Sequence, residues 1–173
     1  MNTQGFSRAV ATHGSPRWAH DGSKSLAAVS GTSKALGNEN LTGQATPTVL
    51  LVEDNHTNQV VALEFLALMG LQTRLATNGL EALAACAEAA PDLVLMDVQM
   101  PGMDGLECTQ RLRELQQTGA LPYFPILALT AHALESDVAA SLKAGMDEHL
   151  TKPLDFIALR TRLGCWIKMP GLS

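Results

Sequence analysis

Short runs of apolar residues, separated by segments of helical pattern, constrain the fold of this chain more than any other feature. Three of these runs contain no polar residue: Val49–Val52, Leu93–Met96 and Ile126–Leu129. An uninterrupted apolar run of this length is typical of a strand that is buried on both faces. Two less uniform segments, 71–76 and 147–150, extend the series to five predicted strands.

Each predicted strand is followed by a segment with helical spacing. In the first such segment Val60, Val61 and Leu66 recur at helical intervals, and Gly70 ends the pattern. Trp166, in the last helical segment, is expected to bury its ring against the sheet. Five strand–helix units joined by short links predict an α/β fold, with a doubly wound parallel sheet between two layers of helices.

Composition divides the chain near residue 47. Glycine, serine, threonine, asparagine and proline make up 21 of the first 46 residues, and no apolar period runs through them. Such a segment buries too little apolar surface to offset the entropy lost on ordering, so residues 1–46 are predicted to be a flexible leader. The folded domain is predicted over residues 47–168, with a short tail over 169–173.

Charge and cysteine content exclude several classes of protein. The net charge of −5 leaves no overall basic field to attract nucleic acid or an anionic membrane. No apolar stretch approaches the length of a membrane span, and the first 28 residues lack the apolar region of a secretory signal. Three widely spaced cysteines without a CxxC pair indicate reduced thiols, which favours a cytoplasmic protein.

Polar residues of complementary chemistry follow the predicted strands. Glu53 and Asp54 follow the first strand, Asp97 the third, Thr130 the fourth and Lys152 the fifth. The carboxyl ends of parallel strands meet at one edge of the sheet, which is where ligands bind in such folds. Each residue alone has an ordinary structural reading as a helix cap, a turn former or a surface cation, but their joint occurrence favours a site.

The chemistry of this residue set is specific. Three neighbouring carboxylates repel one another and raise one another's pKa values unless a cation lies between them. Oxygen ligands suit a hard ion, and Mg²⁺ typically combines carboxylates with a phosphoryl oxygen. With the acids neutralised, one carboxylate can attack phosphorus and form an acyl phosphate, while Lys152 and the Thr130 hydroxyl stabilise charge on the transferred oxygens.

Four stretches of the sequence resemble the receiver domain of two-component response regulators, over about residues 47–168. They are Val52-Glu53-Asp54-Asn55, the run Met96 to Gly105, Leu129-Thr130-Ala131, and Gly145-Met146-Asp147 through Lys152-Pro153. The resemblance implies a flavodoxin-like sheet with strand order 2-1-3-4-5. It also implies a signalling module with only its own autophosphorylation and autodephosphorylation chemistry, rather than an enzyme.

Carried over by position, the resemblance implies roles for the acidic residues. Asp97 would be the phosphoacceptor. Mg²⁺ would be held by Glu53, Asp54 and Asp97, with the backbone carbonyl of Gln99 as a further ligand. Glu53 stands where the family often has an aspartate, which is a familiar variant with a longer reach.

The resemblance also implies how the site would signal. Thr130 would be the switch hydroxyl, and Lys152 would contact the phosphoryl group, with a cis peptide bond to Pro153. His149 occupies the position at which the family usually has a tyrosine or phenylalanine switch residue. This departure puts the usual aromatic coupling in doubt.

Histidine kinases or histidine phosphotransfer proteins are the partners that the resemblance implies. By position, the docking surface would include Asn58, Val61 and Leu154, although Val61 and Leu154 fit equally well as core residues. The motifs around Glu53 and Asp97 are most similar to those of receivers attached to hybrid sensor kinases. Signalling would occur by protein contact or onward phosphotransfer, and the resemblance leaves a phosphorylation-dependent dimer open.

Two alternative functions compete with a phosphorylatable receiver. A degenerate receiver that serves only as a docking module would not need the complete set of acids, hydroxyl and lysine. A haloacid-dehalogenase-type phosphatase also uses an aspartate at a strand end with Mg²⁺, but it needs a second acid two residues later, where this chain has Gln99. The dinucleotide and P-loop glycine motifs do not occur.

Overall fold

The computed structural model describes residues 43 and 45–171, in which five strands alternate with five helices. Most of the predicted leader over 1–46, and the end of the predicted tail, lie outside the described residues. The elements in chain order are β1 (Thr48–Val52), α1 (His56–Leu68), β2 (Gln72–Ala76), α2 (Gly79–Glu88), β3 (Leu93–Asp97), α3 (Gly105–Gln117), β4 (Ile126–Thr130), α4 (Glu135–Ala144), β5 (Glu148–Thr151) and α5 (Phe156–Trp166).

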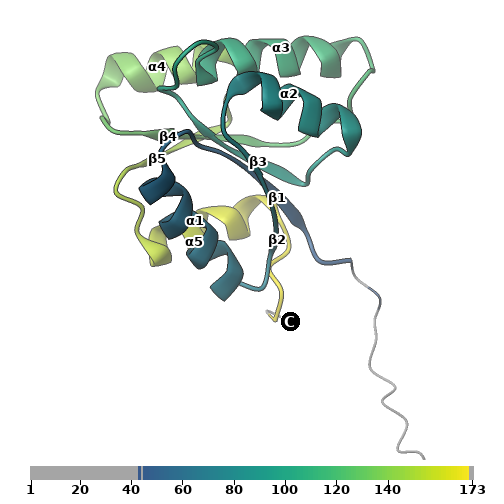
Figure 1. Cartoon of the computed structure of the whole chain (residues 1–173), viewed down its shortest axis with the longest axis vertical. Helices are drawn as coiled ribbons and strands as arrows, with labels where there is room; N and C mark the ends of the chain where they lie inside the picture. The colour runs from purple at the N-terminus through teal and green to yellow at the C-terminus, as the bar shows by residue number, and fades with distance from the viewer. Residues whose placement is uncertain (1–42, 44, 172–173) are drawn as a thin grey trace, which may run out of the picture. The chain divides into compact units, whose positions relative to one another are not determined.

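The strands form one parallel sheet in the order β2-β1-β3-β4-β5, which confirms the predicted architecture and strand order. Helices α1 and α5 cover one face, and α2, α3 and α4 cover the other (Figure 1). No helix in the described part of the chain is long and apolar enough to cross a membrane.

The central strands are apolar except at one end residue each, because both of their faces are covered. Successive side chains of β3 point to opposite faces, so Val94 joins the core under α2 and α3 while Leu95 joins the core under α1 and α5. The same alternation holds in β1 and β4, and nearly all the residues of these three strands are fully buried. Because these strands are closely packed on both faces, the middle of the sheet is a rigid support for the residues at its carboxyl edge.

Short polar side chains start most of the helices. Asn55, Asn78, Asp104 and Asp155 each accept a hydrogen bond from the backbone N–H three residues later, at the starts of α1, α2, α3 and α5. Helix α4 has no such cap and ends at Gly145, whose φ of 103° lies in the left-handed region. These caps set the point at which the chain leaves each strand end and turns into a helix.

The expectation that Trp166 buries its ring against the sheet is wrong, whereas the orientation of α1 decides between the two alternatives left open for Val61. Val60 and Val61 are 52% and 39% exposed, so neither is a core residue, and the buried face of α1 is formed by Gln59, Ala62 and Leu66. Trp166 is 38% exposed, and its indole N–H donates to Glu148 Oε2 at 2.8 Å. Apolar residues occur nearly all round α1, so spacing alone did not identify which side faces the sheet.

The turn after β3 leaves no room for a side chain at Gly105. A Cβ atom there would overlap the backbone carbonyl oxygen of Asp97 and lie 2.9 Å from Val98 Cα. Both of these are main-chain atoms, so the loop that follows Asp97 would have to move. Gly164 in α5 differs, because a Cβ there would meet Met169 at an ordinary 3.6 Å.

We expect Gly105→Ala to lower the free energy of unfolding by about 2–3 kcal/mol, because it overpacks backbone against backbone. Gly164→Ala is the matched control and should be neutral, or stabilising by up to about 1 kcal/mol, since alanine favours a helix interior. Urea titrations followed by far-ultraviolet circular dichroism measure both. Equal stabilities for the two variants would contradict the tight turn at Gly105.

Candidate functional site

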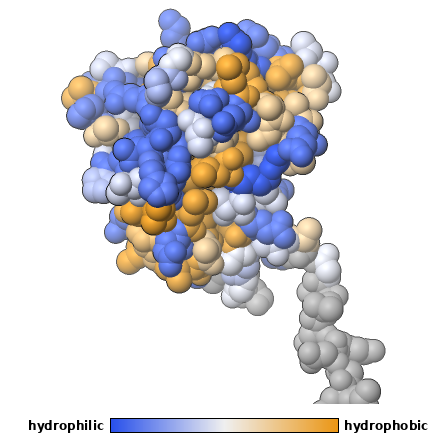
Figure 2. Space-filling model, in the orientation of Figure 1, coloured by the Kyte–Doolittle hydropathy of each residue, from blue (hydrophilic) through white to orange (hydrophobic). Residues whose placement is uncertain are grey.

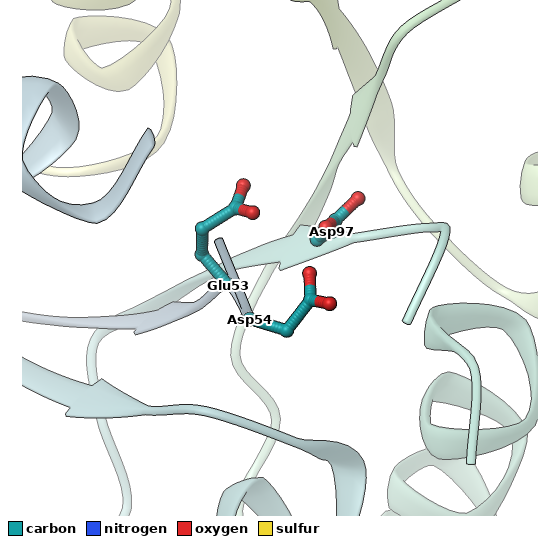
Figure 3. Close-up of side chains that lie close together, drawn as sticks. All are labelled: Glu53, Asp54 and Asp97. Atoms are coloured by element: carbon teal, nitrogen blue, oxygen red, sulfur yellow. The ribbon is translucent and has the colours of Figure 1, made fainter. Parts of the chain in front are cut away.

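Three carboxylates gather at the carboxyl edge of the sheet. Glu53 and Asp54 directly follow β1, and Asp97 is the last residue of β3, the neighbouring strand. One oxygen of each lies within 4.8 Å of the others, and Figure 3 shows the three side chains converging. Glu53 and Asp97 are only 1% and 2% exposed, whereas Asp54 is exposed to solvent.

Lys152 links the two buried acids. Its Nζ lies 3.2 Å from Glu53 Oε2 and 3.1 Å from Asp97 Oδ1. Its backbone N–H donates to the carbonyl of Thr130 at 2.7 Å, which holds the end of β5 against the end of β4. The Lys152–Pro153 peptide bond is cis, as the resemblance implies. Side chains from the ends of β1, β3 and β5 therefore meet at one point.

Several hydrogen bonds orient the acids. The backbone N–H of Asn55 and the side-chain amide of Asn58 donate to Glu53 Oε1 at 3.1 and 3.3 Å. The Gln59 side chain, which is buried, donates to the backbone carbonyl of Glu53 at 2.8 Å. The Gln99 N–H donates to Asp97 Oδ1 at 3.1 Å. The sequence analysis missed the role of Gln59, although a glutamine amid the apolar residues of α1 was a usable signal.

Burial and charge shift the pKa of the central groups. Burial is the largest cause that raises the pKa of Asp97, the negative charge of Glu53 adds to it, and Lys152 opposes both, so that the pKa reaches about 6. Burial alone would lower the pKa of Lys152, but its hydrogen bond and charge interactions with Asp97 and Glu53 outweigh burial and raise it. The site therefore stabilises the protonated form of Lys152 and destabilises the ionised form of Asp97.

Thr130 and His149 lie on β4 and β5, two neighbouring strands on one side of β3. Thr130 is the buried last residue of β4, and its hydroxyl donates to the carbonyl of His132 at 2.7 Å. It also accepts from the His132 N–H at 3.2 Å. His149 is half-buried on β5, in register with Ala128. In this state the Thr130 hydroxyl is engaged with its own loop rather than with the acids.

Asn58, Val61 and Leu154 surround a small cavity beside the acids. The cavity has a volume of about 60 Å³ and also contacts Glu53, Lys152 and Pro153. Val61 is an exposed residue of α1, while Leu154 is half-buried against the core under α1 and α5. The three residues thus lie together at the surface next to the acidic group, and Val61 is not a core residue.

The donor set suits a hard divalent cation. The carboxylate of Asp54 and the second oxygen of Asp97 accept no hydrogen bond from residues that the structure describes, and both belong to the acidic cluster. Oxygen-only ligands at a partly solvated site match the preference of Mg²⁺ for a few carboxylates combined with water. A cation there would also relieve the repulsion that raises the pKa of Asp97.

The fold and site define a doubly wound α/β module with an acidic pocket at the ends of its central strands. Residues 49–164 match the family described as the response regulator receiver domain. The sensor histidine kinase GacS of Pseudomonas protegens is 43% identical over 116 residues, and RcsC of Salmonella typhi is 36% identical over 118. The chain belongs to the response regulator receiver family, whose members are signalling modules of two-component systems.

The matches to the kinases are partial. They cover 67% and 68% of this chain but only 12% of each kinase, so the similarity concerns one segment of much longer proteins. The described residues thus correspond to the receiver segment of hybrid sensor kinases. This agrees with the resemblance of the sequence motifs to those of receivers attached to hybrid sensor kinases.

Solved structures agree with the family assignment. The receiver domain of sensor kinase PA1611 from Pseudomonas aeruginosa, which carries magnesium in its active-site cleft, is 35% identical, with a TM-score of 0.63 over 70% of this chain and 98% of that one. The receiver of Ssk1 from Saccharomyces cerevisiae, crystallised with the phosphotransfer protein Ypd1, is 31% identical, with a TM-score of 0.66 over 71% and 91%.

The raised pKa of Asp97 predicts a pH-dependent cost to stability. Because the pKa is about 6 in the folded state and near 4 in the unfolded state, this carboxyl stabilises the fold only while protonated, and that stability is lost as the pH rises through about 6. In EDTA at pH 7.5 we expect Asp97→Asn to be more stable than wild type by about 1–2 kcal/mol.

The gain should shrink as the pH falls from 6 toward 4, where the wild-type carboxyl becomes protonated. Urea titrations of both proteins across this range measure the difference. A gain that does not change with pH would assign the effect to packing rather than to the buried charge.

Proposed function

We propose that Asp97 accepts a phosphoryl group from a phosphohistidine on a partner protein, with Mg²⁺ bound at the acidic group. The observation that carries the proposal is the position of Asp97. It is a buried carboxylate at the end of a central strand, with an ammonium at 3.1 Å and two further acids beside it. Bound Mg²⁺ would offset the charge of the acids and of the phosphoryl oxygens.

The chain's own residues have distinct tasks in this reaction. A carboxylate oxygen of Asp97 attacks phosphorus, the bond from phosphorus to the imidazole nitrogen breaks, and its electron pair stays on that nitrogen. Lys152 stabilises negative charge on the transferred oxygens, for which its raised pKa keeps it protonated. Glu53, Asp54 and Asp97, together with the Gln99 carbonyl, would hold the cation.

The Thr130 hydroxyl is proposed to link phosphorylation to the surface. Turning toward a phosphoryl oxygen would break its hydrogen bond to the His132 carbonyl and release the loop before α4. His149, on the adjacent strand, would respond to that movement. The change would bias the face built from α4, β5 and α5, through which the domain would contact a partner or a second copy of itself.

Acetyl phosphate with Mg²⁺ should add one phosphoryl group to the chain, on Asp97, in a linkage that hydroxylamine cleaves. Asp97→Asn should abolish the label because an amide is a poor nucleophile, and EDTA should prevent it. Intact-protein mass spectrometry measures all three. A label that persists in the variant or in EDTA would refute the assignment, and no label on the wild-type chain would favour a degenerate docking module.

Helix α1 and the loop before α5 are the proposed docking surface for the phosphohistidine partner. Apolar side chains gather on the part of the surface where α1 and α5 lie (Figure 2), and the exposed large ones on these two helices are Val60, Val61, Leu68, Ile157 and Trp166. Val61, Leu154 and Asn58 line the cavity next to Lys152, so a partner seated there would reach Asp97. The complex of the Ssk1 receiver with Ypd1 supports a phosphotransfer protein as the partner.

Val61→Glu should slow transfer from a histidine phosphotransfer protein at least tenfold, because a charge at the centre of a small interface removes a large part of its affinity. Labelling by acetyl phosphate should be unchanged. Leu142→Glu is the matched control, since it places the same charge on an exposed leucine near the end of α4, which lies on the other face of the sheet (Figure 1). The measurement is the rate of transfer from a phosphorylated protein that labels the wild-type chain.

An equal loss with both donors would place Val61 in the reaction site or the fold rather than in the interface. An equal effect of Leu142→Glu and Val61→Glu would show that the loss is not specific to the surface of α1 and would contradict the proposed docking surface. We further propose a cytoplasmic location, which the free thiols of Cys86, Cys108 and Cys165 support.

A further inference from the structure

The carboxylate of Glu53 is held from both sides. Lys152 lies against Oε2 at 3.2 Å, while the Asn55 N–H and the Asn58 side-chain amide both donate to Oε1. The backbone carbonyl of the same residue accepts from Gln59. With 1% exposure, Glu53 has little contact with water, so these donors replace its hydration.

The Asn58 amide differs from the other donors on this carboxylate. The Asn55 N–H belongs to the backbone, and Lys152 divides its charge between Glu53 and Asp97. Among the described residues, Asn58 is therefore the one whose side chain donates to the Glu53 carboxylate and to no other carboxylate of the acidic group, since Gln59 donates to the backbone carbonyl. Glutamate also has one more rotatable bond than aspartate, so more conformational freedom must be removed to hold its carboxylate in place.

We propose that Asn58 is a positioning residue that sets the divalent-cation affinity of the site by fixing the Glu53 carboxylate. This inference rests on the proposed Mg²⁺ site. Without the amide, Glu53 Oε1 keeps only the Asn55 N–H as a donor, so this oxygen can move from its present position in the acidic group. The acidic group then offers the cation a less ordered and less negative set of oxygens.

The position of Asn58 in the helix allows this role to be separated from a structural one. The cap of α1 is the side chain of Asn55, which accepts from the Asn58 backbone N–H at 3.1 Å. A change of the Asn58 side chain leaves that hydrogen bond in place. Asn58 is also only half-buried, so a replacement of similar size fits without opening a core cavity.

The test measures Mg²⁺ and Mn²⁺ affinity of the full chain by isothermal titration calorimetry. Asn58→Leu, which keeps the size and removes the donor, should weaken both affinities about tenfold, at the low end of the range for residues that orient metal ligands. Thr57→Leu is the matched control, an exposed neighbour on the same helix turn, and should bind as wild type does. If Asn58→Leu does not fold, Asn58→Ser, whose side chain is one atom shorter, serves instead.

A double-mutant cycle with Glu53→Ala decides whether Asn58 acts through Glu53. In the Glu53→Ala background Asn58→Leu should cause no further loss of affinity, because its acceptor is already gone. If the affinity losses of the two single variants multiply in the double variant, or if Asn58→Leu binds both cations as wild type does, the inference is overturned. The Mg²⁺ proposal would remain intact in either case. A wild-type chain that binds neither cation would overturn both.

Discussion

Glu53 and Asp97 hold two carboxylates almost entirely out of water, and the ammonium of Lys152 lies within 3.2 Å of both. Breaking such a buried arrangement by removing one partner leaves an uncompensated charge, which is why its geometry must be maintained by the rest of the fold. The arrangement is also incomplete, because one cation faces two buried acids and a third exposed one. Burial, with the negative charge of Glu53 added to it, raises the pKa of Asp97, and a divalent cation beside the acids would oppose this rise.

The parallel sheet supplies the geometry that this cluster requires. The ends of β1 and β3 are adjacent because the strands pair in register, with Val52 opposite Met96. Lys152 follows the strand at the far edge of the sheet, and its backbone N–H donates to the carbonyl of Thr130. Gly105 lets α3 begin against the carbonyl of Asp97, so the loop that carries Gln99 stays close to the acids.

A second ionic group stabilises the opposite end of β4 and β5. Arg113 of α3 pairs with Asp147 at 2.7 Å and donates to the carbonyls of Gly145 and Phe124, while Tyr123 donates to the same Asp147 carboxylate. These contacts join α3, the end of α4 and the starts of β4 and β5. They hold the amino ends of the two strands whose carboxyl ends carry Thr130 and Lys152, so a movement of the Thr130 loop would take place against a fixed base.

The amino-acid sequence by itself determined the α/β class, the positions of the strands and the identity of the acids at their ends. Apolar runs such as Leu93–Met96 report burial on both faces directly, because a solvent-exposed face would need polar residues. Tertiary structure decided what local pattern leaves open. Val60 and Val61 face solvent while Gln59 is buried, since the side of α1 that meets the sheet depends on packing against β1 and α5. The pairing of Lys152 with Asp97 and Glu53, which precede it by 55 and 99 residues in the sequence, arises only when separate strand ends meet, because no short-range spacing encodes a contact between distant segments.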